Sequence, residues 1–483
     1  MTGIRRSTLA ADARRVLGRS FSGRCIGRDE DDIALANKQH AATWPLPLPE
    51  LLIACRTQQD IVRAFEFVRD KGVSFSVRSG GHCFADLSNR GEVILDCAGV
   101  NSLEIGEGRQ VVAGPGVLSG DAIATLLNAN MTLPVGGCPL VALGGLSLVG
   151  GFGLTGRSQG LLSDRVSAAH VLLADGRLLE CRADRHADLL WAITGAGPLG
   201  FGIVTQLRFD SSPPRSGVAI DGAWPIAQAG EIFALWQNYA PAADPAVSVQ
   251  ISLMAPEDPD DACFVRCYGV VLDTGQGDDG IDALLQTMAR HFGPFAGRID
   301  VAAKPAQTMP LYACGARTYR DEAAWLPSRP YTGTALLAQR SQFFDAPIPA
   351  EAITELVERI QADRTALQAR EIECIPWGGT YARSNPGSCF SHRQAHMLLR
   401  YNSLTGRNPP PAVRASMQVW VDDCRKILNP HANGRIYAGY AEKDLADPMA
   451  SYFGEAAGRL DTLKRRYDPD TIFKGSASLA GPR

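Results

Sequence analysis

Apolar positions along the chain change spacing in a definite order, which predicts the elements of a first domain. From residue 51 they indicate a strand, "LLIAC", a helix, "TQQDIVRAFEFVRDKG", and a second strand, "VSFSVRS", which together make a βαβ unit. Beyond residue 79, Gly and Asp break up short strands such as "GEVILDC", "RQVVAGPG" and the hairpin "AAHVLLADGRLLEC", which turns at Asp175-Gly176. An apolar strand over 202–209 and the linker "SSPPRSG" end this mixed α+β domain, predicted as residues 1–215.

A second domain is predicted over residues 216–414, where strands alternate with amphipathic helices. The strands include "VSVQISLMA" and "CFVRCYGVVLD", a helix is written "PAEAITELVERIQ", and the proline-rich break "NPPPAV" comes near the end. Residues 415–483 then hold most of a helix, a short strand, "GRIYAGYAE", and a last helix, "YFGEAAGRLDTLKRRYDP". The 483 residues thus have room for two or three domains and a large buried ligand.

Composition and charge exclude several classes of partner. There are 48 Lys and Arg against 51 Asp and Glu, with no long basic run, so nucleic acid is not expected as a partner. No apolar stretch is long enough to cross a bilayer, and Asp12 favours an ordinary first helix over an organellar targeting segment. The 12 cysteines lack the paired spacing of a disulfide framework or a metal site. Reduced thiols in the cytoplasm are therefore expected.

Two short motifs compete for the glycine-rich centre of the chain. "GFGLTG" at 151–156 matches the dinucleotide fingerprint, but "RSQGLLSD" after it lacks the apolar period of the required helix, and Asp175 is explained by its hairpin turn. "GRSQG" at 156–160 spells a nucleophile elbow, yet neither a strand before Ser158 nor a helix after it is convincing. A glycine-rich loop explains both motifs better.

Two glycine-rich segments account for more residues than either motif. "RSGGH" ends in His82, and "LPVGGCPLVALGGLSLVGGFGLTGRSQGLLSD" contains Cys138. Backbone N–H groups at glycines can surround a pyrophosphate, because a missing side chain lets a ligand approach closely. Taken singly, His82 could be a hydrogen-bonded loop histidine and Cys138 a buried apolar thiol. Their shared setting instead favours a long dinucleotide between the segments.

These segments resemble the FAD-linked oxidases of the vanillyl-alcohol oxidase type, and among them the berberine bridge enzyme-like branch. "VRSGGH" with "GEVILDC" is similar to the family's pyrophosphate loop, "GGCPLVALGGLSLVGGFG" to its second flavin segment, "DLLWAITGAGPLGFGIVT" to its WAxRGGG stretch, and "RRYDPDTIFKGSASL" to its closing segment. The resemblance implies a two-subdomain FAD-binding fold, residues 1–215 and 415–483, around a substrate-binding domain, residues 216–414, with an antiparallel sheet covered by helices.

The same resemblance implies FAD joined to the protein twice, through His82 and through Cys138. Two bonds would hold the flavin ring still and make it a better hydride acceptor. The residues that this resemblance assigns to the cofactor are Arg78, Ser79, Gly80, Gly81, His82, Cys83, Gly137, Cys138, Val141, Gly144, Gly145, Leu148, Gly150, Gly151, Gly153, Gly202, Ile203, Val204 and Tyr437.

The chain departs from the family at three positions. Cys83 stands where Ser is usual, Thr194 where Arg is usual, and Gly439 where YxNY has Asn. The first exchanges one small residue for another. The last matters more, because a missing amide could leave a hydrogen bond on the flavin side unmade.

Oxidation of a C–H bond beside oxygen or nitrogen needs a base as well as a flavin. Tyr440 is the candidate base, with Tyr437 three residues earlier and so on the opposite face of a regular strand. Arg400, in "MLLRYN", would favour the phenolate form of a nearby tyrosine. The alternatives are two core tyrosines with satisfied hydroxyls and a solvated arginine on a strand.

The resulting prediction is an FAD-dependent oxidase that removes hydride and proton from a small organic molecule and reduces O2 to hydrogen peroxide. Val141 stands where relatives have a small side chain that leaves room for oxygen. A dehydrogenase of the same fold with another acceptor is the alternative, and a flavoprotein that binds without turnover is a third hypothesis. The substrate stays open among sugars, alcohols and secondary metabolites, as does the choice between monomer and homodimer.

Overall fold

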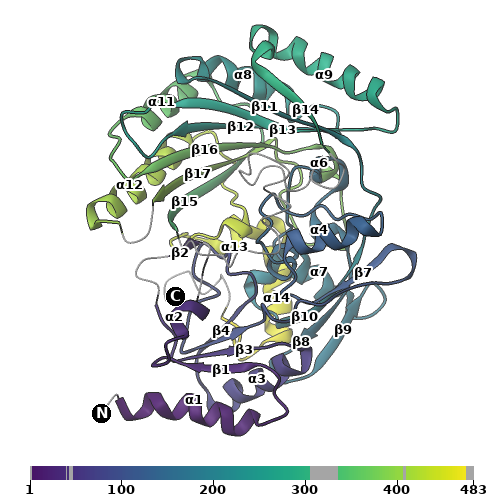
Figure 1. Ribbon diagram of the computed structural model, residues 1–483, viewed down its shortest axis with the longest axis vertical. Coiled ribbons are helices and arrows are strands. Elements are labelled where there is room, and N and C mark those ends of the chain that lie inside the picture. The colour runs from purple at the N-terminus through teal and green to yellow at the C-terminus, as the bar shows by residue number, and fades with distance from the viewer. Residues whose placement is uncertain are drawn as a thin grey trace.

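The computed structural model describes residues 3–37, 39, 41–42, 47–304, 335–405 and 409–474. Asn408 of the proline-rich break and residues 475–479 of the closing segment lie outside these ranges. Three sheets organise the described chain: two small ones lie in the lower half of Figure 1, and an eight-stranded sheet lies above them.

The first small sheet has the strand order β1-β3-β5-β4 and contains the predicted βαβ unit. Its strands are β1 (Arg24–Gly27), β3 (Leu51–Ala54), β4 (Phe75–Arg78) and β5 (Val93–Asp96), and β5 lies between the parallel β3 and β4. Helix α3 (Gln58–Lys71) begins at a capping box of Thr57 and Asp60 and ends at Gly72, whose φ is +63°. Helix α1 (Gly3–Leu17) and β2 (Ala41–Ala42) come from the first 42 residues.

The second small sheet packs against helices from the N-terminal half of the chain and from its C-terminal part. Its order is β6-β7-β10-β8-β9, with β6 (Leu103–Ile105), β7 (Gln110–Ala113), β8 (Val166–Leu172), β9 (Leu178–Arg182) and β10 (Ile203–Asp210). Its core includes side chains of α4 (Ser119–Asn128), α7 (Ala187–Ala196), α13 (Pro448–Phe453) and α14 (Ala457–Tyr467). The C-terminal helices therefore share a hydrophobic core with the N-terminal half of the chain.

The large sheet has one apolar and one polar face. Its order is β14-β11-β13-β12-β16-β17-β15-β2, with β11 (Gly217–Pro225), β12 (Val247–Ala255), β13 (Phe264–Leu272), β14 (Ile299–Lys304), β15 (Ala335–Phe344), β16 (Ala369–Pro376) and β17 (Met397–Thr405). Its outer face is covered by α8 (Ala229–Tyr239), α9 (Asp278–Phe292), α11 (Ala350–Gln361) and α12 (Pro411–Leu428) (Figure 1). On β12, Val249, Ile251 and Leu253 pack against these helices. The alternate residues therefore face the lower half of the molecule.

Two local expectations change in the structure. The expected domain boundary at 414/415 falls inside α12, which packs against the large sheet as far as Leu428. The strand expected over 434–442 is wrong: residues 438–440 form the 3-10 helix η8 (Ala438–Tyr440), closed by a hydrogen bond from Tyr440 N to Tyr437 O. Ile436 and Ala438 are drawn into the core of the second small sheet, whereas Tyr437 packs with aromatic rings on the other side. No strand in the described chain pairs with this segment.

The two competing motifs lack the setting that their functions require. Residues 156–159 form only a single turn, α6 (Gly156–Gln159), which ends at Gly160 with φ +92°. No strand leads into that turn, and the Ser158 hydroxyl accepts a hydrogen bond from Arg215 at 2.8 Å. A helix this short offers neither a dinucleotide fingerprint nor a nucleophile elbow. Within the described ranges, no helix has both the length and the apolarity to cross a bilayer.

Candidate active site

A cavity of about 760 Å³ lies where the polar face of the large sheet meets the glycine-rich segments. Its walls come from the loop after β4, the second glycine-rich segment, the start of β10, the segment around η8, and strands β12, β13, β16 and β17. It brings together these residues predicted from the sequence: Ser79, Gly80, Gly81, His82, Cys83, Gly137, Cys138, Val141, Gly144, Gly145, Leu148, Gly153, Gly202, Ile203, Val204, Arg400, Tyr437 and Tyr440. The volume suits a large organic cofactor together with a small ligand.

The glycine pair after β4 lets the two glycine-rich segments touch. A Cβ at Gly80 would lie 2.8 Å from the backbone nitrogen of Ala142, too close for any other residue. Gly81 follows with φ +68°, a left-handed conformation that glycine adopts without strain. The chain therefore leaves the strand here because the second segment packs against it, and this turn sets His82 in the cavity wall.

Two neighbouring glycines of the second segment have different roles: one allows close packing of the backbone, and the other leaves space in the cavity. A Cβ at Gly144 would lie 2.5 Å from the carbonyl oxygen of Pro115, whereas one at Gly145 would meet only Ser79 Oγ, at 3.7 Å. Gly145 lines the cavity, so its missing side chain is space kept for a ligand. This bare backbone fits the pyrophosphate of a dinucleotide such as FAD.

The two cysteines beside the cavity have different surroundings. Burial raises the pKa of the Cys138 thiol, while hydrogen bonds from the N–H groups of Leu140 and Val141 and the charge of Arg400 oppose the shift. Burial also raises the pKa of Cys83, whose sulfur accepts from the N–H groups of its own loop at residues 85, 87 and 88. Cys83 thus makes the loop contacts that a serine could make, and Cys138 is the thiol held beside a cation.

Three predicted cofactor residues, Arg78, Gly150 and Gly151, do not line the cavity. The Arg78 side chain is buried against Asp96 at 2.6 Å and donates to the carbonyl of Ala36 at 2.6 Å, so it holds the sheet to the N-terminal segment. Gly150 turns the chain with φ +99°, and the Gly151 N–H donates to the Tyr437 hydroxyl at 3.1 Å. All three residues therefore contact other parts of the protein and not the cavity.

The structure gives physical reasons for two departures from the family. The single hydrogen of the Thr194 hydroxyl has two carbonyl acceptors in reach, that of Leu190 in its own helix at 2.9 Å and that of Gly387 at 3.1 Å, so the hydroxyl is satisfied within the protein. A Cβ at Gly439 would lie 2.4 Å from the ring of Tyr437. Glycine at 439 is therefore needed for the position that the Tyr437 ring takes here.

Tyr437 and Tyr440 lie together, contrary to the expectation of opposite faces. Their ring centroids are 5.0 Å apart at an interplanar angle of 86°, and the Phe152 ring contacts both. The turn at η8 replaces the pleat of a strand and brings both side chains to the cavity. Burial raises the pKa of Tyr437, while its hydrogen bond from Gly151 only partly opposes this shift.

Arg400 lies against Tyr440 and is no solvated surface arginine. Its Cζ is 4.5 Å from the centre of the Tyr440 ring, and the two side chains share a hydrogen bond. Glu373 at 3.5 Å and Asn402 at 2.5 Å hold the guanidinium in place. Burial raises the pKa of Tyr440 to about 12 although Arg400 opposes the shift. Arg400 alone therefore does not produce a phenolate at neutral pH in this site.

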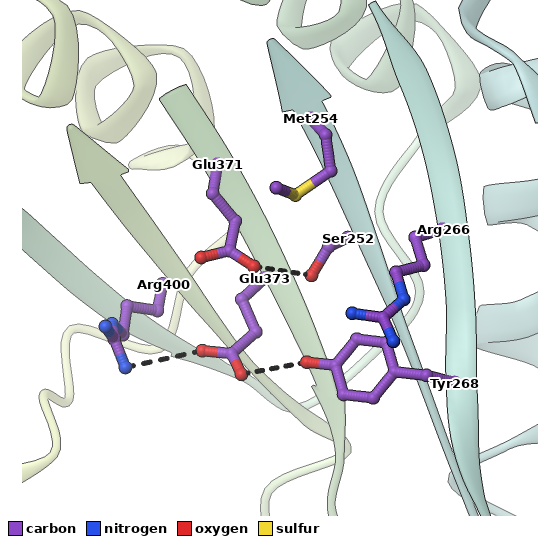
Figure 2. Close-up of a pocket in the computed structure, with 7 residues that line it drawn as sticks. All are labelled: Ser252, Met254, Arg266, Tyr268, Glu371, Glu373 and Arg400. Carbon is purple, nitrogen blue, oxygen red and sulfur yellow. Dashed lines mark hydrogen bonds and ion pairs between the residues drawn. The ribbon is translucent and has the colours of Figure 1, made fainter. Parts of the chain in front are cut away.

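Sequence reasoning missed a row of polar residues on the large sheet, shown in Figure 2. A smaller pocket of about 160 Å³ is lined by Ser252, Met254, Arg266, Tyr268, Glu371, Glu373 and Arg400. It shares Arg266, Glu371, Glu373 and Arg400 with the main cavity, so the two lie side by side. In "REIECIP" the two glutamates alternate with the buried Ile372 and Cys374, an alternation that could have revealed them.

Two family descriptions match parts of the chain. An FAD binding domain matches residues 49–182, which hold both glycine-rich segments. A segment described as berberine and berberine like matches residues 436–479, which hold both tyrosines. The two matches thus meet at the cavity from opposite ends of the sequence.

Individual relatives extend the likeness over the whole chain. An uncharacterised FAD-linked oxidoreductase of Bacillus subtilis, YgaK, is 24% identical over 468 residues, 95% of this chain and 97% of the relative. The (R)-6-hydroxynicotine oxidase of Paenarthrobacter nicotinovorans is 35% identical over 165 residues, 34% of this chain and 36% of that enzyme. A solved chitooligosaccharide oxidase superposes with a TM-score of 0.82 at 18% identity, over 99% of this chain and 100% of its own. The structural likeness confirms the predicted α+β fold.

Proposed function

We propose that the chain is a berberine bridge enzyme-like FAD-linked oxidoreductase and that it acts as an oxidase, which uses O2 as its electron acceptor and releases hydrogen peroxide. Its substrate would be a small organic molecule that loses a hydride and a proton. The observation that carries the proposal is one continuous cavity with the cofactor segments on one side and the Tyr440–Arg400 pair on the other.

The residues present fit FAD held from two segments. His82 and Cys138 line the same cavity on segments that touch at Gly80 and Ala142, and both would bond covalently to the flavin. When bound, the flavin supplies the acceptor for a hydride. Cys138 reacts as a thiolate, which its two backbone N–H groups and the charge of Arg400 favour against burial.

Tyr440 takes the substrate proton in this proposal, and Arg400 stabilises the charge. The guanidinium remains a cation throughout, so it lowers the cost of a phenolate without accepting the proton itself. Because burial raises the pKa of Tyr440 to about 12, little of the phenolate is present at neutral pH. The rate of proton removal is then limited by the fraction of Tyr440 that is ionised. The ring of Tyr437 packs against that of Tyr440 and positions it. The Tyr437 hydroxyl is itself held by a hydrogen bond from the Gly151 N–H.

Val141 supports the oxidase over the alternative, a dehydrogenase with another acceptor. It is half-buried in the cavity wall three residues beyond Cys138, and its short side chain leaves space beside the cofactor segments. Oxygen is small enough to use such space.

Reduction and re-oxidation of the bound flavin test the proposed function. The purified yellow protein is mixed anaerobically with a panel of sugars, alcohols and amines, and loss of the visible flavin absorbance identifies a substrate. Air is then admitted. The proposal expects rapid return of the absorbance with formation of peroxide, whereas a flavin that stays reduced in air would assign the protein to the dehydrogenases. A flavin that no compound reduces would favour a binding protein.

A further inference from the structure

The smaller pocket on the large sheet is built almost entirely from polar side chains and adjoins the main cavity, with which it shares Arg400. Figure 2 shows residues of four neighbouring strands pointing into it, with Met254 as its apolar member. Ser252 and Met254 come from β12, Arg266 and Tyr268 from β13, Glu371 and Glu373 from β16, and Arg400 from β17. A ligand whose reacting carbon lies at Tyr440 would extend a second group into this pocket.

The charges of the pocket do not balance. Arg266 is paired with Asp221, whose two carboxylate oxygens accept from its guanidinium at 3.0 and 2.7 Å, and it also lies over the ring of Tyr268. Arg400 is shared between Glu373 at 3.5 Å and the ring and hydroxyl of Tyr440. Two carboxylates therefore face the pocket with one shared guanidinium between them. The surplus is negative.

The two carboxylates also have hydrogen-bonding capacity left over. Glu371 accepts from Ser252 at 2.9 Å and from Asn402 at 3.1 Å, and Glu373 accepts from Tyr268 at 3.0 Å. Among the described residues, the second oxygen of Glu373, Oε2, is buried and accepts no hydrogen bond, and it forms an ion pair with Arg400 at 3.5 Å. A carboxylate offers about four acceptor sites, so the pocket calls for a ligand that donates.

A cation meets both demands, whereas a neutral hydroxyl meets one. Burial raises the pKa of Glu373, Arg400 opposes that shift and the charge of Glu371 adds to it, so the carboxylates are costly to keep ionised side by side. A positive ligand group offsets this repulsion and also donates N–H bonds. An anionic group would add a third negative charge.

We propose that this pocket binds a protonated amino group of the substrate, remote from the carbon that is oxidised, with Glu373 and Glu371 as its counter-ions. The inference rests on the proposed function and narrows its substrate to small amine-bearing molecules. Ser252, Tyr268 and Arg400 position the two carboxylates through the contacts given above.

The test compares two probes of nearly the same shape on the flavin-loaded protein. 2-Phenylethylamine is protonated at neutral pH, and 2-phenylethanol is its neutral counterpart. Binding is followed anaerobically by calorimetry and by the change in flavin absorbance. We expect the amine to bind at least about tenfold more tightly than the alcohol. Glu373→Gln and Glu371→Gln should each weaken amine binding by roughly tenfold to a hundredfold and leave alcohol binding unchanged.

Glu257→Gln, at an exposed position just after β12, is the matched control and should change neither affinity. Flavin content and thermal melting show that each variant folds, and the comparison of amine with alcohol in the unchanged protein needs no variant at all. Equal affinity for the two probes, or amine binding that survives both glutamate changes, overturns the inference. So does D-glucose binding that depends on the glutamates when amine binding does not. Absence of flavin would instead overturn the proposed function.

Discussion

Tyr440 is governed by two opposing effects at the scale of single side chains. Its phenol is packed among Phe84, Phe152 and Tyr437, which removes water and raises its pKa. One guanidinium, that of Arg400, works in the other direction. Arg400 also lies over the ring of Phe84, but Tyr440 has the hydroxyl that shares a hydrogen bond with this cation, so changes at either partner separate catalysis from packing.

Replacing Tyr440 with Phe keeps the ring and deletes the hydroxyl. The variant should fold and retain its flavin, yet reduction of that flavin by substrate should slow on the order of a hundredfold to ten-thousandfold, as when other general bases are removed. Tyr437→Phe is the matched control. The Tyr437 hydroxyl accepts a hydrogen bond from Gly151, so its loss should slow flavin reduction far less. Stopped-flow reduction measures both variants. Near-normal reduction in Tyr440→Phe would exclude Tyr440 as the base.

The pH dependence of flavin reduction should report the same pair. The pKa of Tyr440 is raised to about 12, and the base acts as phenolate, so the rate should climb as pH rises from neutral into the alkaline range. Arg400→Gln removes the cation that favours the phenolate, so the pKa rises further and the climb moves to higher pH. A profile that keeps its position, or moves to lower pH, would remove Arg400 from this role. Glu257→Gln should leave the profile in place.

Val141→Leu tests the approach of oxygen. The larger side chain would narrow the cavity wall beside Cys138, so re-oxidation of the reduced flavin should slow by about tenfold or more while reduction by substrate changes little. Mixing reduced protein with air-saturated buffer measures the first rate directly. Rapid re-oxidation in the variant would mean that oxygen reaches the flavin by another route.

At the scale of elements, the sequence predicted the helices and strands whose apolar residues face the core in the order that their spacing indicates. The strand expected at "VSVQISLMA" is β12 (Val247–Ala255), because its alternate apolar residues meet covering helices. The helix after β3 has its capping box and its terminal glycine in the sequence itself. Such elements carry their own signals.

Elements that depend on distant partners could not be predicted in this way. The sequence predicts a strand over residues 434–442, but Ile436 and Tyr437 belong to two different cores and the chain turns at η8 instead. At Glu371 and Glu373, the alternation with buried residues indicates a polar face of a strand, but it does not indicate which residues of other strands lie beside them. Only the pairing of Glu373 with Arg400 across β16 and β17 shows which chemistry faces the cavity.

Two glycines test whether the second segment is a cofactor cradle. Gly145→Ala meets no protein atom closer than Ser79 Oγ, so the free energy of unfolding should stay nearly unchanged while flavin content falls. Gly80→Ala would collide with the Ala142 backbone and should lower both the free energy of unfolding and the flavin content. Gly230→Ala, in helix α8 with nothing nearby, is the control and should lower neither. Denaturant unfolding and flavin absorbance give the two readouts, and full flavin content in Gly145→Ala would contradict the cradle.

At the scale of the whole molecule, the fold brings four distant parts of the sequence to one cavity. The two glycine-rich segments come from the N-terminal part of the chain, the polar row from the large sheet in the upper half of Figure 1, and the tyrosines from the C-terminal segment. The sequence indicated the first and last of these by motif. The polar row follows from the strand order of the large sheet, which no local pattern encodes.

The central claim is that one FAD is held from both segments, by His82 and by Cys138, and the intact mass of the acid-denatured protein tests it most directly. The account predicts that the unchanged protein carries the mass of one FAD after denaturation and that His82→Ala and Cys138→Ala each still carry it. Only the double change should release all the flavin. Unmodified protein mass in the wild type, or loss of the flavin from either single variant, would contradict the claim.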